Sequence, residues 1–311
     1  MTPAPSGPDL RVTIAGIELK NPIIAASGTF GYGVEFEDIV HLDRLGGLVV
    51  KGLSVEPMTG NPPPRLYETA AGMLNAIGLQ NIGARAFLEE KLPALREKNN
   101  VVVIANVFGY TRADYEHTIE ILNEGEGIAA YELNVSCPNT AHGGIQFGSD
   151  PHLLDEVVRT AKRIAKRPLI VKLSPNVTSI AVMAHVAEEA GADAISLVNT
   201  FLAMAIDAES RRPRIANVTA GLSGPAIKPI ALRMVYDAAH EVKIPVIGMG
   251  GITTPMDVVE FMLAGASAVQ VGTASYFDPV ATETLVEGLT AYCRDHRIGR
   301  LSDLTGGLLT D

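Results

Sequence analysis

The chain has 311 residues, of which 47% are hydrophobic and 19% charged, and this composition is typical of a globular protein rather than a disordered or fibrous one. The formal net charge of -10 repels phosphate backbones and acidic lipid headgroups, so we expect neither nucleic acid nor membrane as a partner. The first residues, MTPAPSGPDL, lack the basic and apolar regions of a secretory signal, and we expect a cytoplasmic protein.

Cysteine usage limits the cofactors that this chain can hold by itself. Cys137 and Cys293 are its two cysteines, too few for a disulfide framework or for an iron-sulfur cluster that needs four thiolates. No H-E-x-x-H or comparable ligand set occurs, so no metal site is expected.

Eight short apolar runs rich in Val and Ile are the strongest secondary-structure signal. Each ends near Gly, Pro, Asn or Ser, and each is followed by a segment long enough for a helix. The expected strands are residues 22–28, 46–52, 101–109, 129–137, 168–175, 194–200, 244–251 and 268–274. The expected helices are residues 84–98, 113–124, 151–166, 180–191, 227–242, 255–265 and 280–294.

Buried strands that alternate with helices are typical of a parallel sheet closed into a (β/α)8 TIM barrel. A doubly wound open sheet is the alternative. Residues 11–14 and 17–20 predict an N-terminal β-hairpin at the bottom of the barrel, and residues 53–80 and 201–224 predict long loops at the C-terminal face. Without a linker or an internal repeat, residues 1–311 are interpreted as a single domain.

The expected strands end in residues that are unusually polar for apolar runs. Because active sites of such barrels lie at the C-terminal ends of the strands, these residues should converge. Gly-rich ends on the last two strands, at 248–251 and 272–273, predict a phosphate site built from backbone N–H groups, although two tight turns would also use glycine. A G-x-G-x-x-G dinucleotide motif is absent.

Two lysines and several amides complete this set. Lys51 and Lys172 follow apolar stretches, and a buried ammonium group requires an anion such as a phosphate, a substrate carboxylate, a reduced flavin or a structural carboxylate. Asn side chains pair donor with acceptor and complement amide edges such as those of a pyrimidine or an isoalloxazine. Cys137 follows a strand and is a candidate nucleophile or base, or else an inert buried thiol.

Long motifs spread over nearly the whole chain resemble one known family, the dihydroorotate dehydrogenases of pyrimidine biosynthesis, and specifically the class 1B catalytic subunits. The motifs are PIIAASGTFG, GNPPPR, GMLNAIGLQN, ELNVSCPNT, VKLSPN, GLSGPAIKP, IGMGGI and AGASAVQVGTA. The resemblance implies an FMN-binding TIM barrel that oxidises (S)-dihydroorotate to orotate.

The resemblance also implies roles for individual residues. Cys137 matches the base that removes the C5 proton, Lys51 matches a residue touching substrate and flavin, and Lys172 matches the cation at the N1–C2=O edge of the flavin. The residues that match substrate contacts are Lys51, Asn75, Ala76, Ile77, Gly78, Leu79, Asn134, Asn139, Asn199 and Thr200. Those that match FMN contacts are Ser27, Lys51, Gly52, Asn106, Asn134, Lys172, Val198, Gly224, Gly250, Gly251, Gly272 and Thr273.

Class 1B implies FMN in this chain and an electron-transfer partner, an iron-sulfur flavoprotein subunit that holds FAD and a [2Fe-2S] cluster and reduces NAD. It also implies a homodimer or a heterotetramer with two of each subunit. A fumarate-linked class 1A enzyme, a non-redox phosphate-binding barrel isomerase or lyase, and a non-catalytic scaffold are the alternatives. The run that contains Arg211, Arg212 and Arg214 is more basic than the resemblance predicts.

Overall fold

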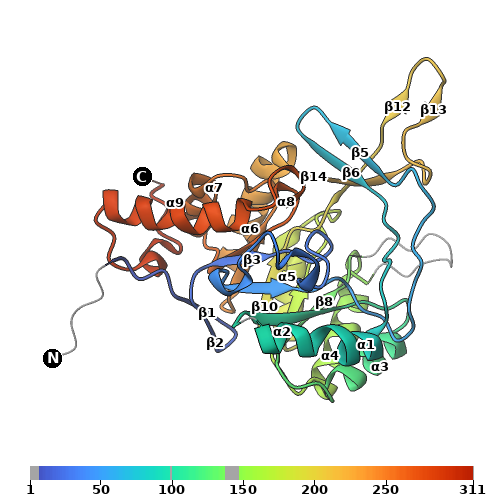
Figure 1. The fold of residues 1–311 in the computed structure, drawn as a ribbon, viewed down its shortest axis with the longest axis horizontal. Helices are drawn as coiled ribbons and strands as arrows, with labels where there is room; N and C mark the ends of the chain where they lie inside the picture. Colours follow the sequence, from blue (N-terminus) through green and yellow to red (C-terminus); the bar gives the residue numbers. More distant parts are fainter. Residues whose placement is uncertain (1–6, 99, 137–146, 311) are drawn as a thin grey trace.

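The computed structural model describes residues 7–98, 100–136 and 147–310. Eight parallel strands close into a barrel in the order β10-β15-β16-β3-β4-β7-β8-β9, with helices packed around them (Figure 1). The closed ring confirms the predicted TIM barrel and excludes the doubly wound sheet. The strands are β3 (Ile23–Ala25), β4 (Gly47–Val49), β7 (Val102–Val107), β8 (Ile128–Asn134), β9 (Leu169–Lys172), β10 (Ala194–Leu197), β15 (Val246–Met249) and β16 (Ala268–Val271).

All seven expected helices are present, and their starts follow local chemistry. Thr111 and Thr254 close capping boxes at the starts of α3 and α7, and Pro151 opens α4 behind Asp150, which accepts two backbone N–H groups. The helices are α1 (Ala84–Ala86), α2 (Leu92–Lys98), α3 (Arg112–Leu122), α4 (Pro151–Ile164), α5 (Ile180–Glu189), α6 (Lys228–Glu241), α7 (Pro255–Leu263), α8 (Ala274–Phe277) and α9 (Ala281–Asp295). A π-helical turn, η3 (Phe87–Lys91), joins α1 to α2.

The first crossover differs from the expectation of a helix after every strand. Between β3 and β4 the chain forms only two 3-10 turns, η1 (Val34–Phe36) and η2 (Leu42–Arg44). Gly31 and Gly33 adopt φ values of 54° and 92° there. Left-handed residues interrupt an α-helix, so this segment turns back to the sheet without one.

The predicted N-terminal hairpin is confirmed as β1 (Val12–Ile14) paired with β2 (Ile17–Leu19). Lys20, which follows it, donates to the carbonyl oxygens of Asp43 and Asn100, at 2.5 and 2.9 Å, and these residues precede β4 and β7. These bonds place the hairpin at the N-terminal end of the barrel. Ile14 and Leu19 are fully buried and join the main hydrophobic core.

The two long loops contain a second sheet that the sequence analysis did not predict. β5 (Leu66–Thr69), β6 (Gly72–Asn75), β11 (Phe201–Ala203) and β14 (Ala220–Ser223) pair in the order β11-β14-β6-β5. This small sheet therefore joins the segment after β4 to the segment after β10. A two-residue ladder, β12 (Ile206–Asp207) with β13 (Arg212–Pro213), extends from it and projects from the body in Figure 1.

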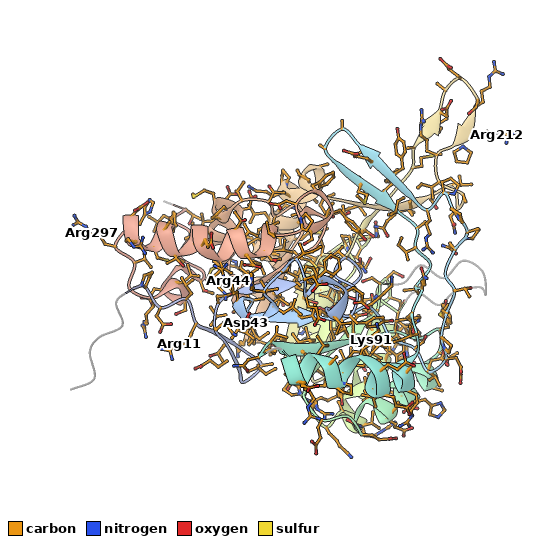
Figure 2. All side chains as sticks on the ribbon, in the orientation of Figure 1. Arg11, Asp43, Arg44, Lys91, Arg212 and Arg297 are labelled. Atoms are coloured by element: carbon orange, nitrogen blue, oxygen red, sulfur yellow. The ribbon has the colours of Figure 1, made fainter. Side chains whose placement is uncertain are left out.

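The basic run on this projection is partly explained. Arg214 lies 3.0 Å from Asp207 Oδ2 and covers the ring of Tyr67, so it fastens the projection to the small sheet. Arg212 lies on the β13 arm of the projection, away from the barrel (Figure 2). Nothing in the structure explains the charge of Arg211 or Arg212.

No helix in the part of the chain that the structure describes is long and apolar enough to cross a membrane.

Candidate active site

A layer of polar side chains crosses the barrel interior near the C-terminal ends of the strands. We call it the polar layer, and its members are Asn106 on β7, Glu132 on β8, Lys172 on β9, Ser196 on β10 and Gln270 on β16. None of them is more than 6% exposed. Polar groups buried to this extent are costly unless they are paired, which marks the layer as a candidate site.

Glu132 lies at the centre of the polar layer. Its Oε1 accepts a hydrogen bond of 2.7 Å from Asn106 Nδ2, and its Oε2 accepts one of 2.9 Å from Ser196 Oγ. Gln270 Nε2 also donates to Oε2, from a strand four positions away in the eight-strand ring. The carboxylate is therefore held from both sides of the barrel.

Lys172 and Asn106 have spare hydrogen-bonding capacity. Lys172 Nζ lies 3.8 Å from Glu132 Oε1, beyond hydrogen-bond distance, and no hydrogen bond from Nζ is present among the described residues. Asn106 Oδ1 and Gln270 Oε1 are buried without a partner there. The layer therefore offers an ammonium donor and two carbonyl acceptors to a ligand.

Gly52, just after β4, keeps space open above Asn106. A Cβ at this position would lie 2.9 Å from Asn106 Oδ1 and 3.2 Å from the Phe108 ring. Either contact would cover the free acceptor, so a side chain at residue 52 is disfavoured. Ser27, half-buried, follows β3 at the same end of the barrel.

The small sheet brings the predicted substrate residues together. Asn75 Nδ2 donates to the Gly221 carbonyl at 3.4 Å, and a Cβ on Gly221 would lie only 2.1 Å from Thr200 Oγ1. Asn75 and Thr200, 125 positions apart in the chain, thus flank the same glycine. The neighbouring Asn199 Nδ2 lies 3.4 Å from Asn134 Oδ1, which links this side to β8.

The segment after Asn75 forms a sharp turn. Gly78 and Leu79 have φ values of 74° and 60°. The Asn61 side chain donates to Ala76 O, and the Asn61 backbone N–H donates to Ile77 O at 3.0 Å. Residues 75 to 79 are all half-buried, as expected of a segment that forms one wall of a site.

The glycines of the predicted phosphate site come from three loops that meet. A Cβ on Gly251 would lie 2.9 Å from Gly224 O, and one on Gly224 would lie 3.4 Å from Thr273 Cγ2. Thr273 Oγ1 donates to Ser223 Oγ at 2.8 Å. Gly250, with a φ of 128°, is the turn after β15, and Gly272 follows β16. Loops this close expose backbone N–H groups in a small space, which suits an anion.

Val198 joins the two halves of this arrangement. Its backbone N–H donates to Met249 O at 3.1 Å, directly before the glycine turn at 250 and 251, and its side chain is 3% exposed. This backbone hydrogen bond therefore helps to connect the substrate side of the predicted site to its phosphate side.

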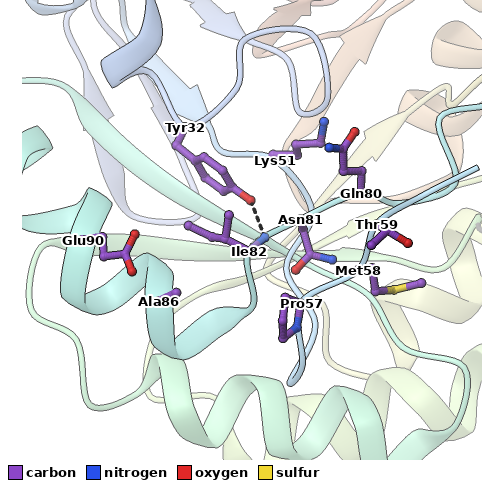
Figure 3. Close-up of a pocket in the computed structure, with 10 residues that line it drawn as sticks. All are labelled: Tyr32, Lys51, Pro57, Met58, Thr59, Gln80, Asn81, Ile82, Ala86 and Glu90. Carbon is purple, nitrogen blue, oxygen red and sulfur yellow. Dashed lines mark hydrogen bonds between the residues drawn. The ribbon is translucent and has the colours of Figure 1, made fainter.

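Lys51 lies in the wall of a cavity of about 600 Å³ beside the barrel mouth (Figure 3). Burial and the nearby charge of Arg65 lower the pKa of its ammonium group. Gln80 lines the same cavity and accepts a 2.7 Å hydrogen bond from Arg65. Tyr32 closes another side, with its hydroxyl oxygen accepting the Ile82 N–H at 3.0 Å.

The described residues fit an FMN group. Paired buried acceptors with a buried ammonium complement a ring edge that carries both N–H donors and carbonyl or anionic acceptors. The converging glycine loops fit a terminal phosphate. No cluster of three or more His, Cys, Asp or Glu able to hold a metal ion occurs among the described residues.

Two predicted site residues, Cys137 and Asn139, lie outside the described residues. The last described residue before them is Ser136, whose hydroxyl donates to Lys172 O at 3.2 Å. The chain therefore leaves the described part directly beside the polar layer.

The sequence analysis missed Glu132, Ser196 and Gln270. Each is a polar residue inside an otherwise apolar strand, in AAYELN, AISL and AVQV. That pattern was available in the sequence, because a charged or amide side chain in a strand buried on both faces must find a partner inside the barrel.

The fold is a TIM barrel whose interior contains a cluster of buried polar side chains, and comparisons with known proteins identify its family. The dihydroorotate dehydrogenase family matches residues 9–292. A protein of Solibacter usitatus, "putative dihydroorotate dehydrogenase A (fumarate)", is 62% identical over 97% of this chain and 99% of its own. Proteins of Geotalea uraniireducens and Geobacter sulfurreducens, each "dihydroorotate dehydrogenase B (NAD(+)), catalytic subunit", are 54% identical over 97% of this chain and 99% and 98% of theirs.

The chain belongs to the dihydroorotate dehydrogenase family. It is an FMN-dependent oxidoreductase that oxidises dihydroorotate.

Proposed function

We propose that this chain is the FMN-carrying catalytic subunit of an NAD-linked dihydroorotate dehydrogenase. Support comes from the polar layer, whose buried Lys172 ammonium and free Asn106 carbonyl suit a flavin ring edge. The names of the Geotalea and Geobacter relatives support the NAD-linked class.

In this proposal FMN, when bound, supplies the acceptor for the hydride that leaves C6 of dihydroorotate. The Cys137 thiolate takes the C5 proton, so that a C5–C6 double bond forms and orotate is released. Asn75, Thr200 and Asn199 orient the pyrimidine ring by their amide and hydroxyl groups. Lys51 provides a cation for the substrate carboxylate, and Lys172 stabilises the negative charge that develops on the cofactor side.

The phosphate of FMN is assigned to Gly224, Gly250, Gly251, Gly272 and Thr273. Their close approach leaves room for main-chain donors and none for side chains at the three tightest positions. Ser27, Gly52 and Val198 complete the proposed flavin contacts.

Electrons must then leave the chain. Its two cysteines cannot ligate a four-thiolate cluster. We therefore propose a partner iron-sulfur flavoprotein subunit that carries FAD and [2Fe-2S], assembled as a heterotetramer with two of each subunit.

A direct experiment tests whether NAD is the final electron acceptor. The purified chain should show flavin absorbance that bleaches on anaerobic addition of dihydroorotate, and should then reduce NAD only when the partner subunit is added. Rapid NAD reduction by the chain alone would contradict the proposal.

The second candidate, a fumarate-linked class A enzyme, is favoured by the name of the 62% identical Solibacter relative. In that case fumarate alone should reoxidise the bleached flavin at a catalytic rate. Failure of dihydroorotate to bleach the flavin at all would contradict both candidates.

A further inference from the structure

We propose that Glu132 is a positioning residue of the flavin site: its carboxylate, held at the centre of the barrel, fixes the Asn106 and Gln270 amides with their oxygens facing the ligand and retains the Lys172 ammonium beside them. This inference rests on the proposed function, because it assigns the polar layer to FMN.

Glu132 itself has no contact left to offer a ligand. It is 0% exposed, and both carboxylate oxygens are occupied by donors from β7, β10 and β16. A residue enclosed in this way can act on the site only through its neighbours. That distinguishes it from Asn106 and Gln270, whose side-chain oxygens have no partner among the described residues.

The amide orientations follow from hydrogen-bond chemistry. A carboxylate accepts hydrogen bonds and cannot donate them, so Asn106 and Gln270 must turn their NH2 groups towards Glu132. Their oxygens, Oδ1 and Oε1, then point elsewhere and have no partner among the described residues. Glu132 thus converts two amides, which could face either way, into fixed acceptors for an N–H group.

The distance to Lys172 has a second consequence. At 3.8 Å the carboxylate attracts the ammonium group without taking one of its hydrogen bonds. The cation is therefore retained in the barrel while its N–H groups stay available to an anionic or carbonyl acceptor. Fixed acceptors beside a fixed cation match a heterocycle edge in which N–H and C=O groups alternate.

Three variants separate charge from position. Glu132→Gln removes the charge and replaces one carboxylate oxygen by an NH2 donor. The NH2 group of Asn106 or Gln270 would then face another donor, so that amide must flip and turn its NH2 group towards the site. Glu132→Asp keeps the charge on a shorter side chain that cannot reach all three donors. Glu283→Gln is the matched control, because Glu283 is also buried (7% exposed) and accepts from His41 and Arg44, but lies on α9 outside the barrel.

The readouts are the FMN dissociation constant, from fluorescence of FMN titrated into apoprotein, and the flavin midpoint potential. Glu132→Gln should weaken FMN binding about tenfold or more, since a buried acceptor is exchanged for a mismatched donor. It should also raise the midpoint potential, because a negative charge has been removed near the flavin while Lys172 remains. Glu132→Asp should weaken binding with a smaller rise in potential, and Glu283→Gln should change neither.

An unchanged dissociation constant and potential in Glu132→Gln would overturn the inference. If that variant does not fold, Glu132→Asp decides, and wild-type FMN affinity there would overturn it equally. Failure of the proposed function looks different, because the wild-type chain itself would then not bind FMN or would not bleach with dihydroorotate.

Discussion

The first residues and the last residues of the barrel strands face the same interior, yet they are chemically opposite. Alternate residues of a strand lie on the same face. On one face of β8 the apolar Ile128 and Ala130 are followed by the polar Glu132 and Asn134. β16 repeats the change, with Ala268 followed by Gln270. The N-terminal half is closed by the β1–β2 hairpin through its buried Val12, Ile14 and Leu19, whereas the C-terminal half contains the polar layer and the glycine loops.

Within a single strand, the apolar first residues therefore serve stability and the polar last residues serve function. Apolar side chains gain free energy of folding when they are buried, whereas buried amides and charges gain little unless every partner is present. The polar layer leaves acceptors unpaired within the described chain, which disfavours folding and favours a ligand.

The largest effect is expected at the N-terminal end. Ile23 is fully buried at the start of β3. Ile23→Ala should lower the free energy of unfolding of the protein by about 2–5 kcal/mol, because it leaves a cavity in a packed core. The flavin midpoint potential should not change. Chemical denaturation and potentiometry test this pair of outcomes, and a shifted potential would show that the two halves are not separable.

At the other end, Cys137→Ser should keep FMN and orotate binding but slow flavin reduction by about 10²-fold or more, since a serine hydroxyl, unlike a thiol, does not ionise near neutral pH to give a basic anion. Stopped-flow absorbance measures the rate. Cys293→Ala is the control, because Cys293 is buried in α9 and burial raises the pKa of its thiol. Equal rates for wild type and Cys137→Ser would remove Cys137 from the mechanism.

Next to the predicted phosphate site, protonation of Asp257 by acid should lower the free energy of unfolding by about 2 kcal/mol in total. Burial opposes ionisation of Asp257, but Lys228 and the N–H groups of Thr253 and Thr254 lower its pKa from 3.8 to about 2. Because the pKa is lower in the folded than in the unfolded chain, the ionised carboxylate stabilises the fold at pH values above the unfolded pKa of 3.8. That stability is lost as pH falls from about 4 towards 2. About half of this loss, about 1 kcal/mol, is expected by pH 3. Denaturation at pH 7 and pH 3 should therefore show a smaller acid loss in Asp257→Asn, and an identical loss would contradict the assignment.

The smallest effect concerns Lys172. Lys172→Ala should lower the flavin midpoint potential by about 30 mV, which corresponds to about 1.4 kcal/mol for a two-electron couple. The reason is that a fixed cation favours the reduced, more negative flavin. Spectroelectrochemical titration measures the shift. An unchanged or raised potential would contradict the placement of Lys172 at the flavin edge.

The barrel could be predicted from the sequence because its signals are local. Runs such as PLIVKLSP and IPVIGMGG carry β-branched residues and their own stop signals, and each matches one observed strand. The small sheet could not be predicted, since β6 pairs with β14 about half the chain away and neither strand exceeds four residues. Short strands that pair over such separations leave no periodic pattern.

The sequence analysis named two members of the polar layer but none of the hydrogen bonds that connect it. Lys172 and Asn106 were identified from their places after apolar runs and from the family resemblance. Their common partner, Glu132, was missed because pairing across a barrel depends on strand order and register, which the sequence does not state. The same limit hid Gly221 between Asn75 and Thr200.

The polar layer also affects the abundance of this protein in a cell. Since buried acceptors without partners lower the free energy of unfolding, any ligand that pairs them stabilises the folded chain by mass action, by about 2.7 kcal/mol at a hundred times its dissociation constant. Chains made while flavin is scarce should unfold more often and be degraded faster. Riboflavin shortage would then reduce pyrimidine synthesis through the abundance of the enzyme as well as through its loading.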